Sequence, residues 1–351
     1  MYKALLDKLY KEHSLSYNEY LELIIHRDEI RDYAAFLARK VREEYYQKKV
    51  YIRGLIEFSN YCKNNCYYCG IRAGNIHAER YRLSKEEIIE CATIGYSLGF
   101  RTFVLQSGED LYYTDEILVD IITEIKNKFP DCAITLSIGE RSYESYKRLY
   151  DAGADRYLLR HETCSKAHYS MLHPNTLSFD NRIECIKNLK SIGYQVGIGF
   201  MVSSPHQSLE MLAEELLFLK EMSPQMVGIG PFLPHRDTPF RNETAGSAEL
   251  TTFMLSLIRL TLPSVLLPAT TALATSDKLG REKGILAGAN VVMPNLSPSG
   301  VREKYLLYDN KICTGDEAAK CIGCLKKKIS TTGYEIVVDR GDYNSQGLTG
   351  E

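Results

Sequence analysis

The sequence lacks the features by which membrane proteins, nucleic-acid-binding proteins and exported proteins are usually recognised. None of its apolar stretches approaches the roughly 20 residues that a membrane-spanning helix needs. Its 43 Lys and Arg residues nearly balance its 45 Asp and Glu residues, so nothing in its net charge of −2 favours nucleic acid or an anionic membrane. Residues 1–13 alternate charged residues with Leu and Tyr at helical spacing, unlike a signal peptide. We therefore expect a cytoplasmic protein that binds neither nucleic acid nor a membrane.

The chain has 10 cysteines, and six of them form two close-spaced groups. Without an export signal, such a number favours metal binding in a reducing compartment over disulfides. The first group is Cys62, Cys66 and Cys69, with the spacing C-x3-C-x2-C. Three thiolates can bind three irons of a cubane cluster, whereas most electron-transfer clusters take four cysteines. The spacing therefore predicts a 4Fe–4S cluster whose fourth iron has no protein ligand.

Zinc is the alternative occupant of this motif. A closed structural zinc site takes four ligands, usually as two pairs. The nearest downstream candidate for a fourth ligand is His77, which would give an unusual C-x3-C-x2-C-x7-H site. The spacing and the position of the motif, directly after an apolar run, favour the iron–sulfur cluster.

From residue 49 onward, short apolar runs alternate with amphipathic stretches. Alternating strands and helices predict a parallel sheet with right-handed crossovers. Eight units over about 240 residues suit a closed (β/α)8 barrel of the TIM type. A doubly wound open sheet is the alternative, but no G-x-G-x-x-G follows an early strand. The expected strands are 51–58, 102–106, 133–137, 156–160, 196–201, 226–230, 265–270 and 290–293, with helices at 85–98, 115–128, 181–192 and 210–221 between them.

The expected barrel, residues 49–300, is flanked by two smaller segments. Residues 1–48 carry apolar positions near a 3.6-residue period and predict a helical extension, with breaks near Tyr17 and Arg27. Residues 301–351 form a C-terminal tail that contains the second cysteine group.

Polar residues follow most of the expected strands. Because active sites of such barrels lie at the carboxyl ends of the strands, these residues should meet in one site. The turn after the second strand could offer backbone groups and a carboxylate to an ammonium group. The residues in question are the cysteine loop, Gln106, Ser107, Gly108, Glu109 and Asp110, then Thr135, Ser137, Arg160, Glu162, Met201, Thr270 and Thr271.

The cysteine spacing resembles the signature of the radical S-adenosylmethionine (SAM) superfamily. Longer stretches, at 56–60, 105–110, 155–163, 226–232 and 268–272, resemble the HydE family within it, from about residue 45 to 325. This resemblance implies that the open iron chelates the amino and carboxylate groups of SAM. It also implies that an electron from the cluster cleaves the sulfonium to a 5′-deoxyadenosyl radical, and that Tyr68 lies against adenine.

The resemblance also implies roles for individual residues. Cys62, Cys66 and Cys69 match the cluster ligands, while Glu162, Arg182 and Ser137 match SAM contacts, with Arg182 pairing with the SAM carboxylate. Gln106, Ser107, Gly108, Glu109 and Met201 are expected to border the cofactor. Thr135, Arg160, Thr270 and Thr271 match cavity-lining positions, and Tyr305 matches a tyrosine near the substrate. For Arg160 and Glu162 the alternative is an internal ion pair, and for the hydroxyl residues a satisfied place in the core.

One stretch departs from the family pattern. Relatives generally have a glycine-containing turn after the fifth strand, whereas residues 201–207 here include Ser203 and His206. Glycine accepts positive φ readily and other residues do not, so these side chains should restrict the loop.

The second cysteine group is Cys313, Cys321 and Cys324, with the spacing C-x7-C-x2-C. It resembles the accessory site of some HydE members, which implies a second iron–sulfur cluster, 2Fe–2S or 4Fe–4S. A zinc knuckle completed by a distant residue is the alternative.

The function that the resemblance implies is maturation of the active-site cluster of [FeFe] hydrogenase. The radical would act on a small iron complex that bears CO, cyanide and cysteine. Companion hydrogenase maturases would supply and accept this complex, and a reduced donor such as ferredoxin would supply the electron. One rival is a radical SAM mutase or sulfur-inserting enzyme that acts on an amino acid, as in methylornithine synthase or biotin synthase. Another is an electron-transfer or scaffold protein without SAM chemistry.

Overall fold

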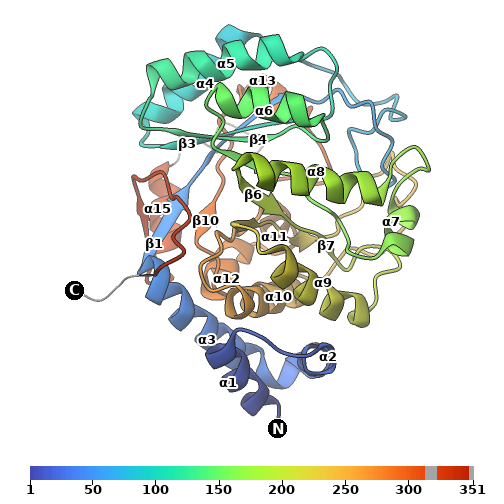
Figure 1. Cartoon of the computed structure of the whole chain (residues 1–351), viewed down its shortest axis with the longest axis vertical. Coiled ribbons are helices and arrows are strands. Elements are labelled where there is room, and N and C mark those ends of the chain that lie inside the picture. The colour runs from blue at the N-terminus through green and yellow to red at the C-terminus, as the bar shows by residue number, and fades with distance from the viewer. Residues whose placement is uncertain (313–321, 348–351) are drawn as a thin grey trace.

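A ring of parallel strands enclosed by helices forms the centre of the computed structural model, which describes residues 1–312 and 322–347 (Figure 1). Six neighbouring strands make up most of the ring, in the order β2-β3-β4-β5-β6-β8. Every pair in this sheet is parallel, as crossover helices require. These strands are β2 (Gly54–Ser59), β3 (Thr102–Ser107), β4 (Ala133–Ser137), β5 (Arg156–Leu158), β6 (Gln195–Ile198) and β8 (Met226–Val227).

The ring closes through the two remaining predicted positions. The seventh apolar run forms single bridges, Met226 to Leu266 and Pro268 to Val291, and not a continuous strand. Val291 belongs to β10 (Val291–Val292), which pairs in parallel with β1 (Lys49–Ile52), and β1 runs directly into β2. The predicted (β/α)8 barrel is thereby confirmed. Two short strands extend it at the carboxyl side, where β7 (Met201–Val202) pairs with β9 (Gly230–Pro231).

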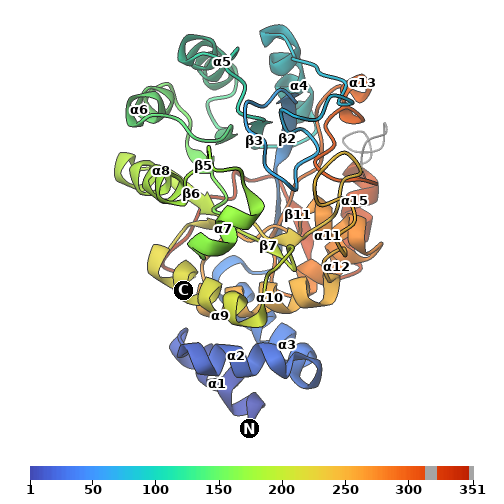
Figure 2. The same ribbon diagram turned by 90° about the vertical axis from the view of Figure 1, so that its right-hand side faces the viewer.

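Helices surround the strands on the outside of the ring (Figure 2). Most begin at a Ser or Thr whose side chain accepts a hydrogen bond from a backbone N–H of the first turn, as at Ser84, Thr114 and Ser178. These caps explain why helices start where they do. The helices are α4 (Lys85–Ser97), α5 (Asp115–Lys128), α6 (Tyr143–Asp151), α7 (Lys166–Leu172), α8 (Phe179–Ile192), α9 (Leu209–Met222), α10 (Ala248–Thr261), α11 (Thr271–Ser276), α12 (Gly280–Leu286) and α13 (Ser299–Arg302).

An N-terminal layer of three helices covers α10 at one side of the barrel (Figure 2). The predicted breaks are present, because α1 (Tyr2–Glu12), α2 (Tyr17–Ile25) and α3 (Arg27–Tyr46) are separate helices. The buried hydroxyl of Tyr20 hydrogen-bonds to Thr261 Oγ1 at 2.8 Å, and His13 Nδ1 lies 2.8 Å from the carbonyl oxygen of Leu260. Since α10 contacts both the barrel and this layer, nearly all of its residues are buried.

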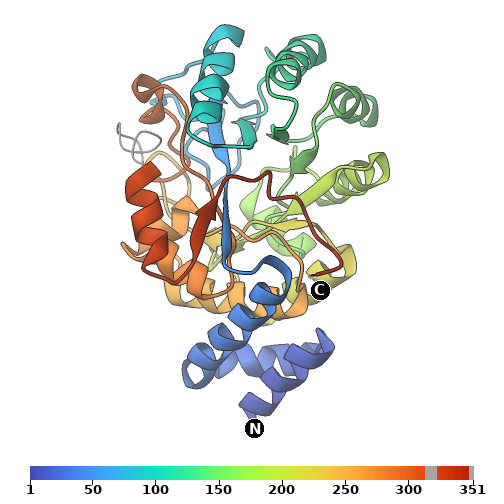
Figure 3. The ribbon, with the colours of Figure 1, turned by 90° about the vertical axis from the view of Figure 1, so that its left-hand side faces the viewer.

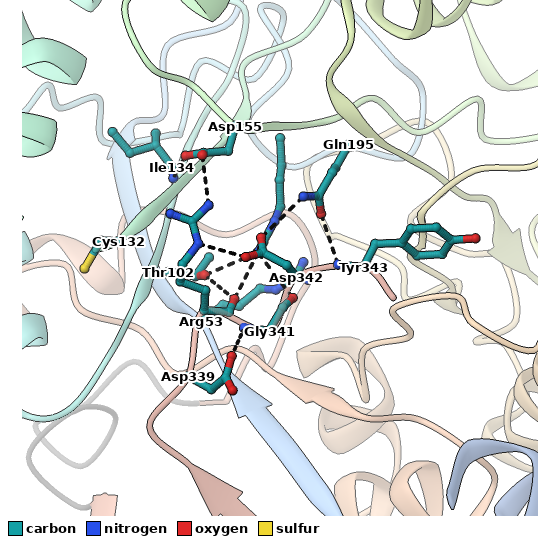
Figure 4. A network of polar contacts seen from close by, with 12 residues as sticks. Arg53, Thr102, Cys132, Ile134, Asp155, Gln195, Asp339, Gly341, Asp342 and Tyr343 are labelled. Carbon is teal, nitrogen blue, oxygen red and sulfur yellow. Dashed lines mark hydrogen bonds and ion pairs between the residues drawn. The ribbon is translucent and has the colours of Figure 1, made fainter. Parts of the chain in front are cut away.

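The C-terminal tail returns to the barrel. After α15 (Ile322–Ser330), β11 (Glu335–Val337) pairs in parallel with β1, so that β1 lies between β10 and β11 (Figure 3). The chain then crosses the amino-terminal ends of the strands. Thr102 Oγ1 donates to the carbonyl of Arg340 at 2.7 Å, and the fully buried Arg156 contacts Asp342 Oδ1 at 2.6 Å (Figure 4). The tail thus covers the end of the barrel opposite the polar strand ends.

Among the described residues, none of the helices combines the length and the apolar character needed to cross a membrane.

Candidate active site

A cavity of about 340 Å³ lies inside the ring, toward the carboxyl ends of the strands. It brings together residues that are up to 255 positions apart in the chain, from Arg53 to Tyr308. Asp110 and Thr271 are the exceptions among the residues expected to meet at the strand ends. Asp110 is hydrogen-bonded to Ser59 and Arg82, Thr271 begins α11, and neither lines the cavity. The predicted residues that do line it are Cys62, Cys66, Tyr68, Cys69, Gln106, Ser107, Gly108, Glu109, Thr135, Ser137, Arg160, Glu162, Arg182, Met201, Thr270 and Tyr305.

The cysteine loop is held in place by backbone hydrogen bonds to three other segments. The amide of Lys63 donates to Glu109, that of Tyr67 to Leu172 and that of Gly70 to Leu307, at 2.9 to 3.0 Å. Gly108 packs directly behind the loop. A Cβ at this position would lie 2.7 Å from Cys62 Cβ and 2.3 Å from the carbonyl oxygen of Tyr61, so only glycine fits.

The three thiols share one environment at the cavity edge. Burial, and next the nearby Cys62 thiol, raise the pKa of Cys69 to about 12, and burial also raises the pKa values of Cys62 and Cys66. Thiols in such surroundings stay protonated unless a metal takes the place of the proton. No group of three His, Cys, Asp or Glu side chains in residues 1–312 and 322–347 converges closely enough to hold one metal ion.

This arrangement fits a cubane cluster better than zinc. Zinc requires its ligands around a single ion, whereas a cubane distributes three thiolates over three irons. His77, the ligand that a zinc site would need, is exposed and lines a neighbouring hollow without the cysteines.

Tyr68 is oriented by a buried histidine. Its ring meets that of His173 edge to face at 5.4 Å, and its hydroxyl lies 3.2 Å from His173 Nε2. His173 Nδ1 lies 3.0 Å from the carbonyl oxygen of Tyr169, which can only accept, so Nδ1 carries the proton. Tyr68 therefore donates to Nε2. Burial lowers the pKa of His173 to about 3, so this hydrogen bond persists at neutral pH.

Arg160 and Glu162 form the internal ion pair that the sequence analysis gave as the alternative, but the pair is not aligned as a hydrogen bond. Arg160 Nη2 lies 3.0 Å from Glu162 Oε2. Both atoms, and Arg160 Nε, are buried and make no hydrogen bond to the described part of the chain. Buried polar atoms are normally satisfied, so these groups remain available to a bound molecule.

The backbone of Glu162 is held in the left-handed region, at φ 67°. His161 beside it is fully buried. Its Nε2 lies 2.8 Å from Glu215 Oε2, and its Nδ1 accepts from the amide of Gly199 at 3.2 Å. A non-glycine residue pays a conformational cost of about 1 kcal/mol or more here, which these contacts offset.

Other predicted cofactor contacts are partly engaged within the chain. Arg182 Nε donates to Glu140 Oε1, and its Nη1 donates to the carbonyl of Arg160 at 2.7 Å. Glu109 accepts from the amide of Glu140 at 2.9 Å and pairs with Lys63 at 3.2 Å. The carboxylate that the turn was expected to offer to an ammonium group therefore already has partners.

The loop after β7 adopts the conformation that the sequence disfavours. Ser203 has φ 57° and His206 has φ 67°. The side chain of Gln207 stabilises the turn, because its Oε1 accepts from the amide of Ser203 at 2.6 Å and its Nε2 donates to the carbonyl of Met201 at 2.9 Å. Side-chain hydrogen bonds here replace the freedom that glycine supplies.

Two charged residues of the cavity region were missed in the sequence. Arg53 is 5% exposed and lines the cavity, and its Nε and Nη2 make no hydrogen bond to the described residues. Glu57 is 1% exposed. Both interrupt the apolar run 51–58, and a charged residue within an expected buried strand was the sequence signal that could have identified them. Of the second cysteine group, Cys324 lies on α15, whereas Cys313 and Cys321 lie outside the described residues.

Comparison with known proteins agrees with this geometry. The model of the radical SAM superfamily matches residues 56–219. The [FeFe] hydrogenase maturase subunit HydE of Thermotoga maritima is 48% identical over 87% of both chains. The 3-methylornithine synthase of Methanosarcina acetivorans is 30% identical over 86% of this chain and 84% of its own. A crystal structure of methylornithine synthase superposes with a TM-score of 0.84 at 28% identity, covering 95% of this chain and 97% of that one.

Proposed function

The chain belongs to the radical SAM superfamily, in the branch that contains HydE, and we propose that it is a maturase of [FeFe] hydrogenase. The 48% identity to HydE carries this proposal, because it extends over most of both chains. The proposed substrate is a small iron complex with CO, cyanide and cysteine ligands. Companion maturases would supply and accept this complex, and a reduced protein such as ferredoxin would be the electron donor.

The residues of the cavity support these roles. Cys62, Cys66 and Cys69 would hold a 4Fe–4S cluster. When bound, the cluster would supply the electron that cleaves SAM to a 5′-deoxyadenosyl radical. Arg182 and Glu162 would orient SAM beside it, since an Arg fork suits a carboxylate and Glu162 Oε2 accepts no hydrogen bond from the described residues.

The deeper part of the cavity suits an anionic substrate. Within the described residues, Arg160 Nε, Arg53 Nε, Arg53 Nη2 and Thr135 Oγ1 make no hydrogen bond, and Arg160 Nη2 is only ion-paired with Glu162. Burying such groups is costly unless a ligand satisfies them. The closed ring and the tail beneath it would help to keep water away from a reactive radical.

The test measures 5′-deoxyadenosine from anaerobically reconstituted, reduced protein with SAM, with and without the iron complex. We expect product from the wild type, consumption of the complex, and neither from Cys62→Ser. The matched control is Cys91→Ser, because Cys91 is buried in α4 away from the cavity. Undiminished 5′-deoxyadenosine from Cys62→Ser would refute the cluster site. SAM cleavage without consumption of the complex would refute the substrate alone.

A radical SAM rearrangement of an amino acid is the second candidate, favoured by the similarity to methylornithine synthase. Supplying lysine and SAM under reduction and searching for a rearranged product would distinguish the two. An electron-transfer or scaffold role would give no 5′-deoxyadenosine in either assay.

The C-terminal cysteines are proposed to hold an accessory iron–sulfur cluster, of the 2Fe–2S or 4Fe–4S type. Their place past the last barrel strand supports an accessory role and not a catalytic one. We accordingly place the chemistry at Cys62, Cys66 and Cys69.

A further inference from the structure

One wall of the cavity is not made by strand ends. Tyr305, Leu307 and Tyr308 line the cavity from the segment 303–312, which follows α13. At its edges this segment is attached to loops of the barrel. Asn60 Nδ2 donates to the carbonyl of Lys304 at 2.6 Å, and the amide of Asp309 donates to the carbonyl of Pro234 at 3.1 Å. The position of Tyr305 therefore depends on how this segment is held.

The inner attachment is an ion pair buried behind the wall. Glu57 on β2 and Lys311 have side chains only 1% and 6% exposed, and Glu57 Oε1 lies 2.5 Å from Lys311 Nζ. The second carboxylate oxygen, Oε2, accepts from Asn295 Nδ2 at 2.8 Å. Both oxygens of Glu57 thus have a donor, as a buried carboxylate requires.

Lys311 directs its ammonium group at Tyr305 as well. Lys311 Nζ donates to the backbone carbonyl of Tyr305 at 2.9 Å and lies 4.9 Å from the centroid of the Tyr305 ring. A cation at that distance over an aromatic face is attractive. One ammonium group therefore contacts both the backbone and the ring of the same residue.

Tyr305 borders the cavity, and its hydroxyl donates to no acceptor among the described residues. It accepts from Gln106 Nε2 at 3.3 Å, so its own proton has no partner in that hydrogen bond. Burial, and next the Glu57 carboxylate, raise the pKa of Tyr305 well above its ordinary value, so the proton stays on. Tyr305 is thereby prepared as a hydrogen-bond donor.

A buried ion pair is a poor means of gaining stability, since desolvation of both charges offsets their attraction. What such a pair can provide is a fixed position, because its two charges are satisfied only when the segment lies in one place. We propose that Glu57 and Lys311 are positioning residues, which hold the wall 303–312 and aim the Tyr305 hydroxyl at the substrate. The identity of that substrate rests on the proposed function, whereas the placement of Tyr305 does not.

The test compares Glu57→Gln, Lys311→Met, their double variant and Tyr305→Phe in the reconstituted holoenzyme. The control is Lys304→Gln, because Lys304 lies in the same segment but pairs with Glu79 at the exposed rim. For each protein we would measure the iron complex consumed per 5′-deoxyadenosine formed, the KM for SAM, and hydrogen exchange of residues 303–312.

We expect Glu57→Gln and Lys311→Met to lower consumption of the iron complex about 10- to 100-fold, the range for a misplaced contact, with the KM for SAM unchanged. Tyr305→Phe should have the same effect on consumption. The double variant should be no worse than either single one, because the two residues act as a pair. Hydrogen exchange in 303–312 should increase in both ion-pair variants but not in Lys304→Gln, and Lys311→Arg should restore part of the activity.

Equal losses of SAM binding and of substrate consumption would overturn the inference in favour of a merely structural role. Wild-type hydrogen exchange in both ion-pair variants would also overturn it. If the wild type itself cleaves SAM but leaves the iron complex unchanged, the proposed function fails, and the exchange measurement still decides the role of the pair.

Discussion

Single side chains in the cavity carry polar atoms that the rest of the described chain does not satisfy. Buried atoms that make no hydrogen bond to the described residues belong to Arg160, Glu162, Thr135 and Arg53. By contrast, Tyr68 in the cysteine loop donates a hydrogen bond to the buried His173. At this scale the site divides into groups prepared for a ligand and groups that orient them.

His173 makes stability depend on pH in a direction that can be tested. Its pKa is lowered to about 3 by burial, so in mildly acidic solution the unfolded chain binds a proton that the folded chain does not. Its contribution to stability is therefore present above about pH 6.5 and declines as the pH falls toward 3. Between pH 6.5 and 5.5 the wild type should lose about 1 kcal/mol through this residue.

Thermal unfolding of the anaerobic holoprotein at the two pH values measures this effect. His173→Asn should show the smaller decrease in Tm, because it removes the titrating group. Burial also lowers the pKa values of His168 and His235, but both residues are common to the two proteins and cancel. Equal decreases in Tm would contradict the assignment.

At the scale of elements, the tail after β11 is tied to three strands at the base of the barrel. Arg156 on β5 would be an uncompensated buried cation without Asp342. Arg340 pairs in turn with Asp155 at 3.0 Å, and Gln195 Nε2 donates to Asp342 Oδ1 at 3.3 Å (Figure 4). The tail thus neutralises the charges of Arg156 and Asp155 at the amino-terminal ends of the strands.

Asp342→Asn should lower the free energy of unfolding by about 1 to 2 kcal/mol. Removing one partner of a fully buried pair costs more, but the side chain of Asp342 is 42% exposed and water screens part of the effect. Glu335→Gln on β11 is the control, because Glu335 is exposed. Chemical denaturation of the three proteins measures the difference, and equal midpoints would contradict the role of Asp342.

At the scale of the whole molecule, the N-terminal layer buries the outer face of α10. Residues of this helix that face away from the barrel, such as Thr261, are buried by α1 to α3. A chain without residues 1–46 would expose that apolar surface.

We expect this truncated chain to bind a hydrophobic dye and to form aggregates, while a chain lacking only residue 1 behaves as the full one. Light scattering and dye fluorescence measure the outcome. A monodisperse truncated chain with an unchanged Tm would show that the layer is dispensable.

The sequence predicted those features that depend on local pattern. Apolar runs at regular spacing located the strands, and the barrel rule placed Cys62, Gln106, Arg160 and Thr270 around one cavity. The seventh run forms only single bridges, because apolar character does not determine how long a hydrogen-bonded register continues.

Features that depend on distant partners could not be predicted in this way. Glu57 and Lys311 are 254 positions apart, and no local signal joins them. Likewise, nothing in residues 335–343 indicates that they cross the base of the barrel. The left-handed turn at Ser203 depends on a side chain four residues away, which propensity rules do not consider.

Gly108 fixes how closely the cysteine loop packs against the turn after β3. With no room for even one methyl group between it and Cys62, the turn after β3 acts as a spacer that determines how closely the start of the loop packs against the barrel. Enlarging this spacer by a single carbon would displace Cys62 and the start of the loop that carries it, while leaving all three thiols chemically intact.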